Sequence, residues 1–261
     1  MDPNQIIGMG VDAYNALDNE SKHALTYPAA KTLGLAADGL ISIFCYPFLK
    51  ARIFTQARLK QYQEETAVKI NKIPEENRDS SKLGLVIKAI EESRYQLNED
   101  DIRHMYVNLI ASTVDNRKNV VVNPRLAMVV AQLGTKEAKL IRELYNQRSY
   151  QAASGHMTVI SSENASNRVI TNEAIALDPN IIHLGIEDSL NILESLGVIK
   201  LKKSTKLFHS MYEIRYKALE RELKKNDFSN VPLNSHEKIV FEYDCVITTF
   251  FGRDLFHCIF E

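Results

Sequence analysis

The side chains that could hold a metal ion or act as a general base are scattered along this sequence of 261 residues. Its seven histidines share no helical face at the spacing that metal ligands need; they are His23, His104, His156, His183, His209, His236 and His257. A histidine without such neighbours usually lies at the surface or half-buried. We therefore predict no metal ligand and no catalytic residue.

One group of residues near the end of the sequence resembles a nucleophile with its base. His257 precedes Cys258, and Cys245 lies in a nearby segment, so a strand and a helix meeting there would join a thiol and an imidazole. Neighbouring residues on a helix point about 100° apart, which favours Cys258 as a small packed side chain. With Cys45 the cysteines number three, without ligand spacing, and predict reduced thiols in a cytosol.

Motifs of common enzymes and cofactor sites do not occur in the sequence. It contains no GxxxxGK[ST], no GxGxxG after a strand, no HExxH and no GxSxG, so the usual signatures of nucleotide, dinucleotide, zinc and serine chemistry are missing. We predict no cofactor and assign no enzyme class. An unrecognised hydrolase stays open, because distant Asp, Glu or His residues could still converge in a pocket.

A basic string near residue 200 has two interpretations; its members are Lys200, Lys202, Lys203 and Lys206. As the wing of a DNA-binding domain it would contact phosphates and release counterions. As a solvated hairpin it would bind nothing. Acidic residues on the preceding helix, Glu187, Asp188 and Glu194, and the scarcity of nearby aromatic residues favour the hairpin, with partner contact left open.

The most apolar stretch spans residues 33–54 and ends in basic residues. Exposed, it could meet a membrane or a partner helix through Leu40, Ile43, Phe44, Phe48, Lys50 and Arg52. Asp38 and Pro47 interrupt its membrane-like part, residues 33–49, which falls short of the roughly 20 apolar residues of a membrane span. We expect a central helix of an N-terminal bundle.

The composition is that of a folded protein with balanced charge. Lys and Arg number 32 and Asp and Glu 33, for a net charge of -1, which argues against a surface wholly committed to a polyanion. Hydrophobic residues make up 45%, enough to form a core. The start, MDPNQIIGMG, lacks the pattern of a secretory signal, so we predict a cytoplasmic protein.

Helical periodicity dominates residues 4–147. In residues 99–114 an apolar stripe is expected to face the core, with Asn98 as cap and the acidic run after it in the first turn. Asn123 and Pro124 predict a helix start. Pro47 is expected to break or kink a helix, the next one beginning at Phe48.

From residue 148 strand-like pieces appear, so we predict two domains, 1–147 and 148–261. The helix ending in LESLGVI, closed by Gly197, followed by KLKKSTKLF, is typical of a winged helix, in which the hairpin is the wing. The fold class predicted is thus mainly α: a multi-helix bundle followed by a winged-helix-like α+β domain. Residues 202–238 depart from a compact wing, and 218–230 are interpreted as a charged insertion.

Several longer segments, in order and spacing, resemble the abortive infection alpha family of bacterial phage-defence proteins. They are PFLKARIF at 47–54, YQEETAVKINKIPEEN at 62–77, DDIRHMYVNLIASTVD at 100–115, NPRLAMVVAQLGTKEAKLIREL at 123–144, LESLGVI at 193–199 and TTFFGRDLFHC at 248–258. The resemblance covers most of the chain. It implies a role in antiphage defence.

We therefore expect a defence protein that acts by protein binding and conformational change, with a phage or host component as partner. A DNA-binding regulator and a membrane-active toxic effector are the alternatives. Peripheral membrane contact and self-association stay open, and nucleic acid is the less favoured partner.

Overall fold

The computed structural model describes residues 33–147, 150–163 and 167–261, which form two compact units. The first comprises residues up to Ala138 together with Asp254–Glu261, and the second comprises Lys139–Arg253. The limits expected from the sequence, 1–147 and 148–261, differ from this division. Each of the two boundaries of the second unit lies within a helix.

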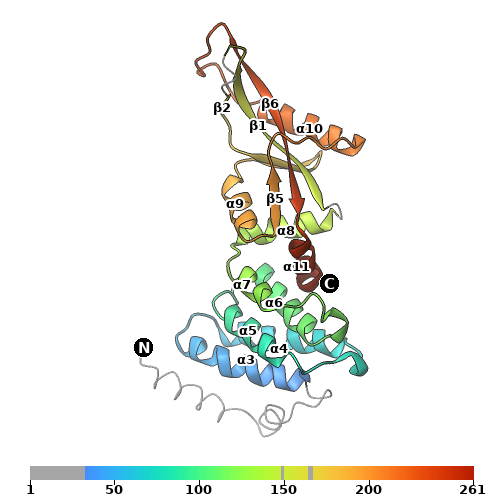
Figure 1. The fold of residues 1–261 in the computed structure, drawn as a ribbon. Helices are drawn as coiled ribbons and strands as arrows, with labels where there is room; N and C mark the ends of the chain where they lie inside the picture. Colours follow the sequence, from blue (N-terminus) through green and yellow to red (C-terminus); the bar gives the residue numbers. More distant parts are fainter. Residues whose placement is uncertain (1–32, 148–149, 164–166) are drawn as a thin grey trace. The chain divides into compact units, whose positions relative to one another are not determined.

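The first unit is helical throughout its described residues (Figure 1). Its elements are α3 Leu33–Lys50, α4 Gln56–Asn71, η2 Glu75–Asn77, α5 Leu83–Ser93, α6 Asp100–Thr113, η3 Asn116–Lys118, α7 Pro124–Ala131 and the start of α8 Thr135–Asn146, with the end of α11 Phe250–Phe260. Helix α6 contacts α4, α5 and α7, and the predicted stripe is confirmed, because Met105, Tyr106 and Ile110 are fully buried.

Local signals predicted some of the helix ends. The Asn123 side chain accepts a hydrogen bond from the Arg125 amide at 3.0 Å, so the predicted cap of α7 is confirmed. At α6 the predicted cap is wrong: Glu99 occupies that position, and the Asn98 amide donates instead to the Ile53 carbonyl at 3.0 Å.

Helix α3 continues through Pro47 to Lys50, so the predicted break at the proline is wrong. Only one further turn follows the proline, and Phe48 in that turn packs edge-on against Tyr95 of the segment after α5, with ring centroids 5.1 Å apart. The next helix, α4, begins at Gln56 and not at Phe48, because the Thr55 hydroxyl caps it by accepting from the Arg58 amide at 3.3 Å.

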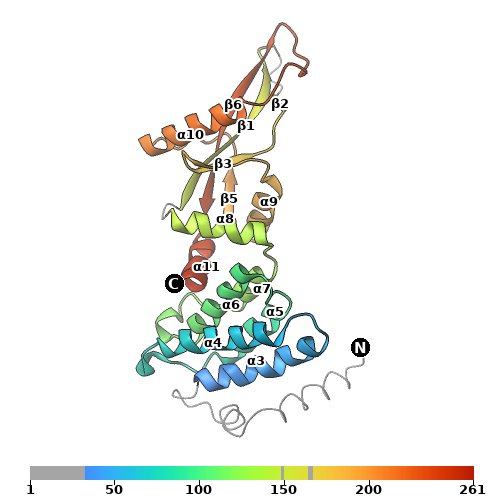
Figure 2. The same ribbon diagram turned by 180° about the vertical axis from the view of Figure 1, so that it is seen from behind.

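The second unit is built on a six-stranded antiparallel sheet in the order β4-β3-β1-β6-β5, with β2 paired to β1. The strands are β1 Gln151–Ser161, β2 Asn167–Val169, β3 Ala174–Asp178, β4 Ile181–His183, β5 Ile199–Lys202 and β6 Glu237–Thr248. The central pair, β1 and β6, runs side by side over the whole length of β1 (Figures 1 and 2).

Helix α10, Ser210–Leu223, covers one face of the sheet. It packs Tyr212, Tyr216, Leu219 and Leu223 against Ala153 and Met157 of β1, Ala174 and Ala176 of β3, and Phe241 of β6. The expectation of a charged insertion at 218–230 is therefore wrong for the helical part, which forms half of a hydrophobic core.

The winged helix is not confirmed. Helix α9, Glu187–Ser195, packs beside β5, and Gly197 closes it with φ at 76°, as predicted. Strand β5 then pairs with β6, but α10 lies between them in the chain, where a compact wing has only a short turn. The fold is mixed α+β and mainly helical.

Gly155 marks the closest approach of β1 to β6. A Cβ atom there would lie 2.4 Å from the Glu242 carbonyl oxygen and 2.5 Å from the Phe241 ring. We therefore expect Gly155→Ala to lower the free energy of unfolding by about 1–3 kcal/mol, because backbone must move. Urea unfolding measures this loss, with Gly84→Ala in α5 as the control, because a Cβ atom at Gly84 meets nothing within 4 Å. That control should be neutral or stabilising by up to about 1 kcal/mol, and equal effects would contradict the explanation.

Candidate functional site: a buried ionic cluster

Ionisable side chains from neighbouring strands gather on the face of the sheet opposite α10. Residues alternate between the two faces of a strand, so His156 points away from the α10 face, which Met157 occupies. Asp244 on β6 lies on the same side, two residue pairs along from the pairing of His156 with Glu242. Glu173 directly precedes β3, and Lys203 directly follows β5. We call His156, Glu173, Asp244 and Lys203 the ionic cluster.

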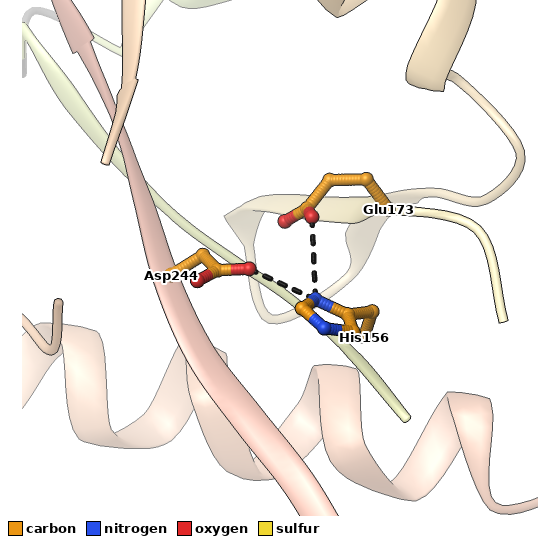
Figure 3. A group of neighbouring side chains, drawn as sticks. All are labelled: His156, Glu173 and Asp244. Carbon is orange, nitrogen blue, oxygen red and sulfur yellow. Dashed lines mark hydrogen bonds and ion pairs between the residues drawn. The ribbon is translucent and has the colours of Figure 1, made fainter. Parts of the chain in front are cut away.

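The imidazole of His156 lies between two carboxylates (Figure 3). Its Nδ1 lies 2.9 Å from Asp244 Oδ2 and 3.4 Å from Glu173 Oε2. On the other side of the ring, Nε2 lies 3.8 Å from Glu242 Oε2. The ring nitrogen that faces both buried acids therefore carries a proton that it donates to Asp244.

A tight turn after β5 brings a second cation to the same carboxylates. The Lys203 ammonium contacts Glu173 Oε2 and lies 3.5 Å from Asp244 Oδ2. Ser204, with φ at 49°, then directs its amide to Asp244 Oδ1 at 2.6 Å. Its hydroxyl donates to Glu242 Oε1 at 2.5 Å. This left-handed residue fixes the end of the turn on β6.

Burial is uneven across the ionic cluster. The side chains of Glu173 and Asp244 are 1% and 0% exposed and that of His156 is 6% exposed, whereas Lys203 is 55% exposed. Two buried negative charges are thus matched by one buried imidazolium and one ammonium that enters from solvent. Removing either carboxylate would leave two cations with one buried negative charge between them.

The electrostatics follow from these contacts. Hydrogen bonds to Asp244 and Glu173 raise the pKa of His156 to about 9. Burial would raise the pKa of Glu173, but the hydrogen bonds from His156 and Lys203 outweigh it and hold this pKa below its ordinary value. Burial likewise opposes the charge of Lys203, yet Glu173 raises its pKa. His156, Glu173 and Lys203 are therefore charged at neutral pH.

Two buried polar atoms beside these ion pairs, Glu173 Oε1 and Ser154 Oγ, form no well-aligned hydrogen bond, although Ser154 lies close enough to Glu173 to help lower the pKa of that carboxyl. Ser154 is paired with Asp244 in the sheet register and so lies on the same face as His156. Among the described residues, His156, Glu173 and Asp244 are a group whose ligand atoms all lie within 4.8 Å of one another. Imidazole nitrogen and carboxylate oxygen are ligands of divalent transition metals.

The sequence model of the family described as Abortive infection alpha matches residues 54–259. The chain belongs to this family. The match includes residues of both units. No curated protein and no solved structure matches the chain.

In this abortive infection alpha protein the four lysines of the predicted basic string have different surroundings. Lys203 is ion-paired in the ionic cluster, and Lys206 pairs with Glu213 at 2.7 Å and lies over the Tyr243 ring. Lys200 is exposed and Lys202 half-buried. Half of the string is therefore engaged within the second unit.

The predicted membrane or partner helix is mostly turned inward where the structure describes it. Leu40 is buried, and Phe48 packs against Tyr95 and beneath the Arg94 guanidinium. Lys50 lies over the Tyr46 ring, and Arg52 is exposed in the turn after α3 with φ at 59°. The side chains of Ile43 and Phe44 lie outside the described residues. Within the described part of the chain, every helix is too short or too polar to cross a bilayer.

Sequence reasoning missed the ionic cluster. The prediction of surface or half-buried histidines is wrong for His156. Asp244, an acid in the middle of the strand-like run EYDCVIT, was the signal that could have indicated a buried charge. By contrast, Cys258 is fully buried, which fits the predicted packing role, and burial raises the pKa of its thiol to about 11.

Proposed function

We propose that this protein serves abortive infection defence by binding a protein partner with its outer α10 surface, and not by turning over a substrate. We define this surface as Phe208, Met211, Ile214, Lys217 and Arg221. Residues 211, 214, 217 and 221 follow one another at steps of three and four and so share one side of α10. Tyr212, Tyr216 and Leu219, which pack on the sheet, take the other side.

The apolar part of this surface carries the proposal. Phe208 is 88% exposed, Ile214 57% and Met211 38%. Large apolar side chains that cluster on a surface helix are typical of protein contacts, because burying them against a partner is their main source of binding free energy.

The charged part indicates the chemistry of the partner. Lys217 and Arg221 are exposed and make no ion pair among the described residues. Together with Lys224 and Lys225 they line an open hollow of about 330 Å³, in which Glu220 is the acidic residue. An acidic protein surface with apolar side chains complements this arrangement.

Protein is favoured over nucleic acid for two reasons. Lys224 and Lys225 are already paired with Glu220 and Glu222, each at 2.6 Å, which leaves fewer cations for phosphates. Phe208 is the one ring among the five residues of this surface, and Met211 and Ile214 offer none for base stacking. Lys203 is also ion-paired within the ionic cluster, which leaves one cation fewer for a phosphate backbone.

The test is phage challenge of cells that carry the gene or its variants. We expect the double variant Phe208→Ser/Ile214→Ser to protect cells at least about tenfold less than the wild type, because it removes two exposed apolar side chains that would contact the partner. Val169→Ser, which changes a 62% exposed residue on β2, is the matched control and should protect like the wild type. Equal protection by both variants would contradict the proposal.

Two further measurements on purified protein separate the other partners. Sedimentation detects a second copy of the chain on the surface, and salt-dependent gel shifts detect nucleic acid. A gel shift that weakens in Lys217→Glu/Arg221→Glu would replace the proposal by nucleic-acid binding. Self-association that Phe208→Ser/Ile214→Ser abolishes would replace it by oligomer formation.

A further inference from the structure

We propose that His156, Glu173 and Asp244 form a site for a divalent transition-metal ion, and that this ion and the Lys203 ammonium compete for the same two carboxylates. The inference goes beyond the proposed function. It concerns the face of the sheet opposite α10 and does not depend on any contact of the outer α10 surface.

The separations of the three ligand atoms suit a first coordination shell. Nitrogen and oxygen ligands bound at about 2.1 Å stand about 3.0–3.4 Å apart in octahedral or tetrahedral geometry. His156 Nδ1 lies 2.9 Å from Asp244 Oδ2 and 3.4 Å from Glu173 Oε2. One ion can therefore reach all three atoms with small side-chain adjustments (Figure 3).

The charge balance of the ionic cluster allows the exchange. Glu173 and Asp244 together carry two negative charges, which the Lys203 ammonium and the proton on His156 now offset. A divalent ion that takes the place of that ammonium and that proton leaves the net charge of the buried site unchanged. Exchange thus leaves no uncompensated charge inside the protein.

The competing Lys203 ammonium can leave the two carboxylates toward solvent. The Lys203 side chain is 55% exposed, whereas both carboxylates are buried in the sheet. The lysine can swing into solvent, because its stem is long and flexible and water solvates its ammonium there. The ligands would stay in place, since β1 and β6 hold His156 and Asp244 in one continuous register.

A second observation points to a ligand at this position. Glu173 Oε1 is buried and forms no well-aligned hydrogen bond, so the second oxygen of this carboxylate can also face a bound ion. Ser154 Oγ is buried on the same face, close enough to Glu173 to help lower the pKa of that carboxyl, but it too forms no well-aligned hydrogen bond. Buried polar atoms rarely remain unsatisfied unless a water or an ion serves them.

The donor set selects the class of ion. One imidazole and two carboxylates suit Zn²⁺, Mn²⁺, Fe²⁺ or Co²⁺, whereas Mg²⁺ and Ca²⁺ prefer oxygen ligands throughout. Glu242 Oε2, 3.8 Å from His156 Nε2, can orient the ring from the far side as an outer partner.

The experiment uses the full-length protein, treated with chelator and then titrated with Zn²⁺ by calorimetry and with Co²⁺ by visible absorption. We expect Lys203→Met to bind at least about tenfold more tightly than the wild type, because the competing ammonium is gone. We expect His156→Gln and Glu173→Gln to bind at least about tenfold more weakly than the wild type.

Matched controls are Lys206→Met, which removes a neighbouring lysine outside the ionic cluster, and His183→Gln, which removes a histidine paired with Glu143 on another part of the second unit. Both should bind like the wild type. Melting curves check that each variant is folded. Where wild-type binding is too weak to measure, Lys203→Met is compared with the double variant Lys203→Met/His156→Gln. Lys203→Met that binds no tighter than the wild type, or His156→Gln that binds equally well, would overturn the proposal.

Discussion

Replacing Asp244 by Asn is expected to lower the free energy of unfolding by about 3–5 kcal/mol, which is the range for breaking a buried ion pair on one side. Asp244 is fully buried and serves three partners at once: His156 Nδ1 at 2.9 Å, the Lys203 ammonium at 3.5 Å and the Ser204 amide at 2.6 Å. Asparagine keeps an oxygen for the amide. It removes the negative charge, so two cations then face Glu173 alone.

Urea unfolding followed by circular dichroism measures this effect. The matched control is Asp188→Asn in the first turn of α9, where the carboxylate is exposed and contributes through the helix dipole. That change should cost less than about 1 kcal/mol. A loss at Asp244 no greater than the loss at Asp188 would show that the buried pairing contributes little to the stability of the second unit.

Local signals were enough to predict much of the first unit. The stripe of α6 recurs every three to four residues within one helix, so its buried side could be read without knowledge of the neighbours. The cap at Asn123 and the turn at Gly197 are equally local, because the atoms that they satisfy lie within a few residues. The break predicted at Pro47 shows the limit of such local signals. A proline one turn from a helix end removes few backbone hydrogen bonds, and the packing of Phe48 outweighs that loss.

The ionic cluster depends on pairing over long distances in the chain, which no local window contains. His156 and Asp244 are 88 residues apart, and Lys203 and Glu173 are 30 apart. Strand β1 begins with QAASG, small residues of low strand propensity, and only the apolar part after it predicts a strand. Pairing with β6 extends β1 back to Gln151, and His156 therefore lies within the paired strand.

The wing was mispredicted for a related reason. The sequence from α9 into β5 does resemble the start of a hairpin, and β5 does pair with β6. What the local pattern could not show is that the returning strand comes after α10, whose apolar side packs on Met157 of β1, Ala176 of β3 and Phe241 of β6. The charges of α10 that suggested an insertion belong to its solvent side.

The second large effect concerns pH. Because the folded protein holds the pKa of His156 at about 9, above its ordinary value of 6.5, protonation of this side chain favours the folded state. Its contribution is complete below pH 6.5 and is lost as the pH rises through about 9. Over that window the loss amounts to roughly 3 kcal/mol. The groups that face the ring are Glu173, Asp244, Glu242 and Lys203, and Asp244 and Glu173 are the ones that hold its proton.

The measurement is the free energy of unfolding of the wild type and of His156→Gln from pH 6 to pH 10, with a chelator present so that metal binding does not contribute. Burial raises the pKa of the Cys45 thiol to about 12 and that of Cys258 to about 11, which also weakens folding at high pH, but equally in both proteins. The difference between the two curves therefore isolates His156. It should be largest near pH 6 and shrink toward pH 10, because the imidazolium that Asp244 and Glu173 stabilise is then neutral. Curves that stay parallel over the whole range would mean that His156 is not held in its protonated form by these carboxylates.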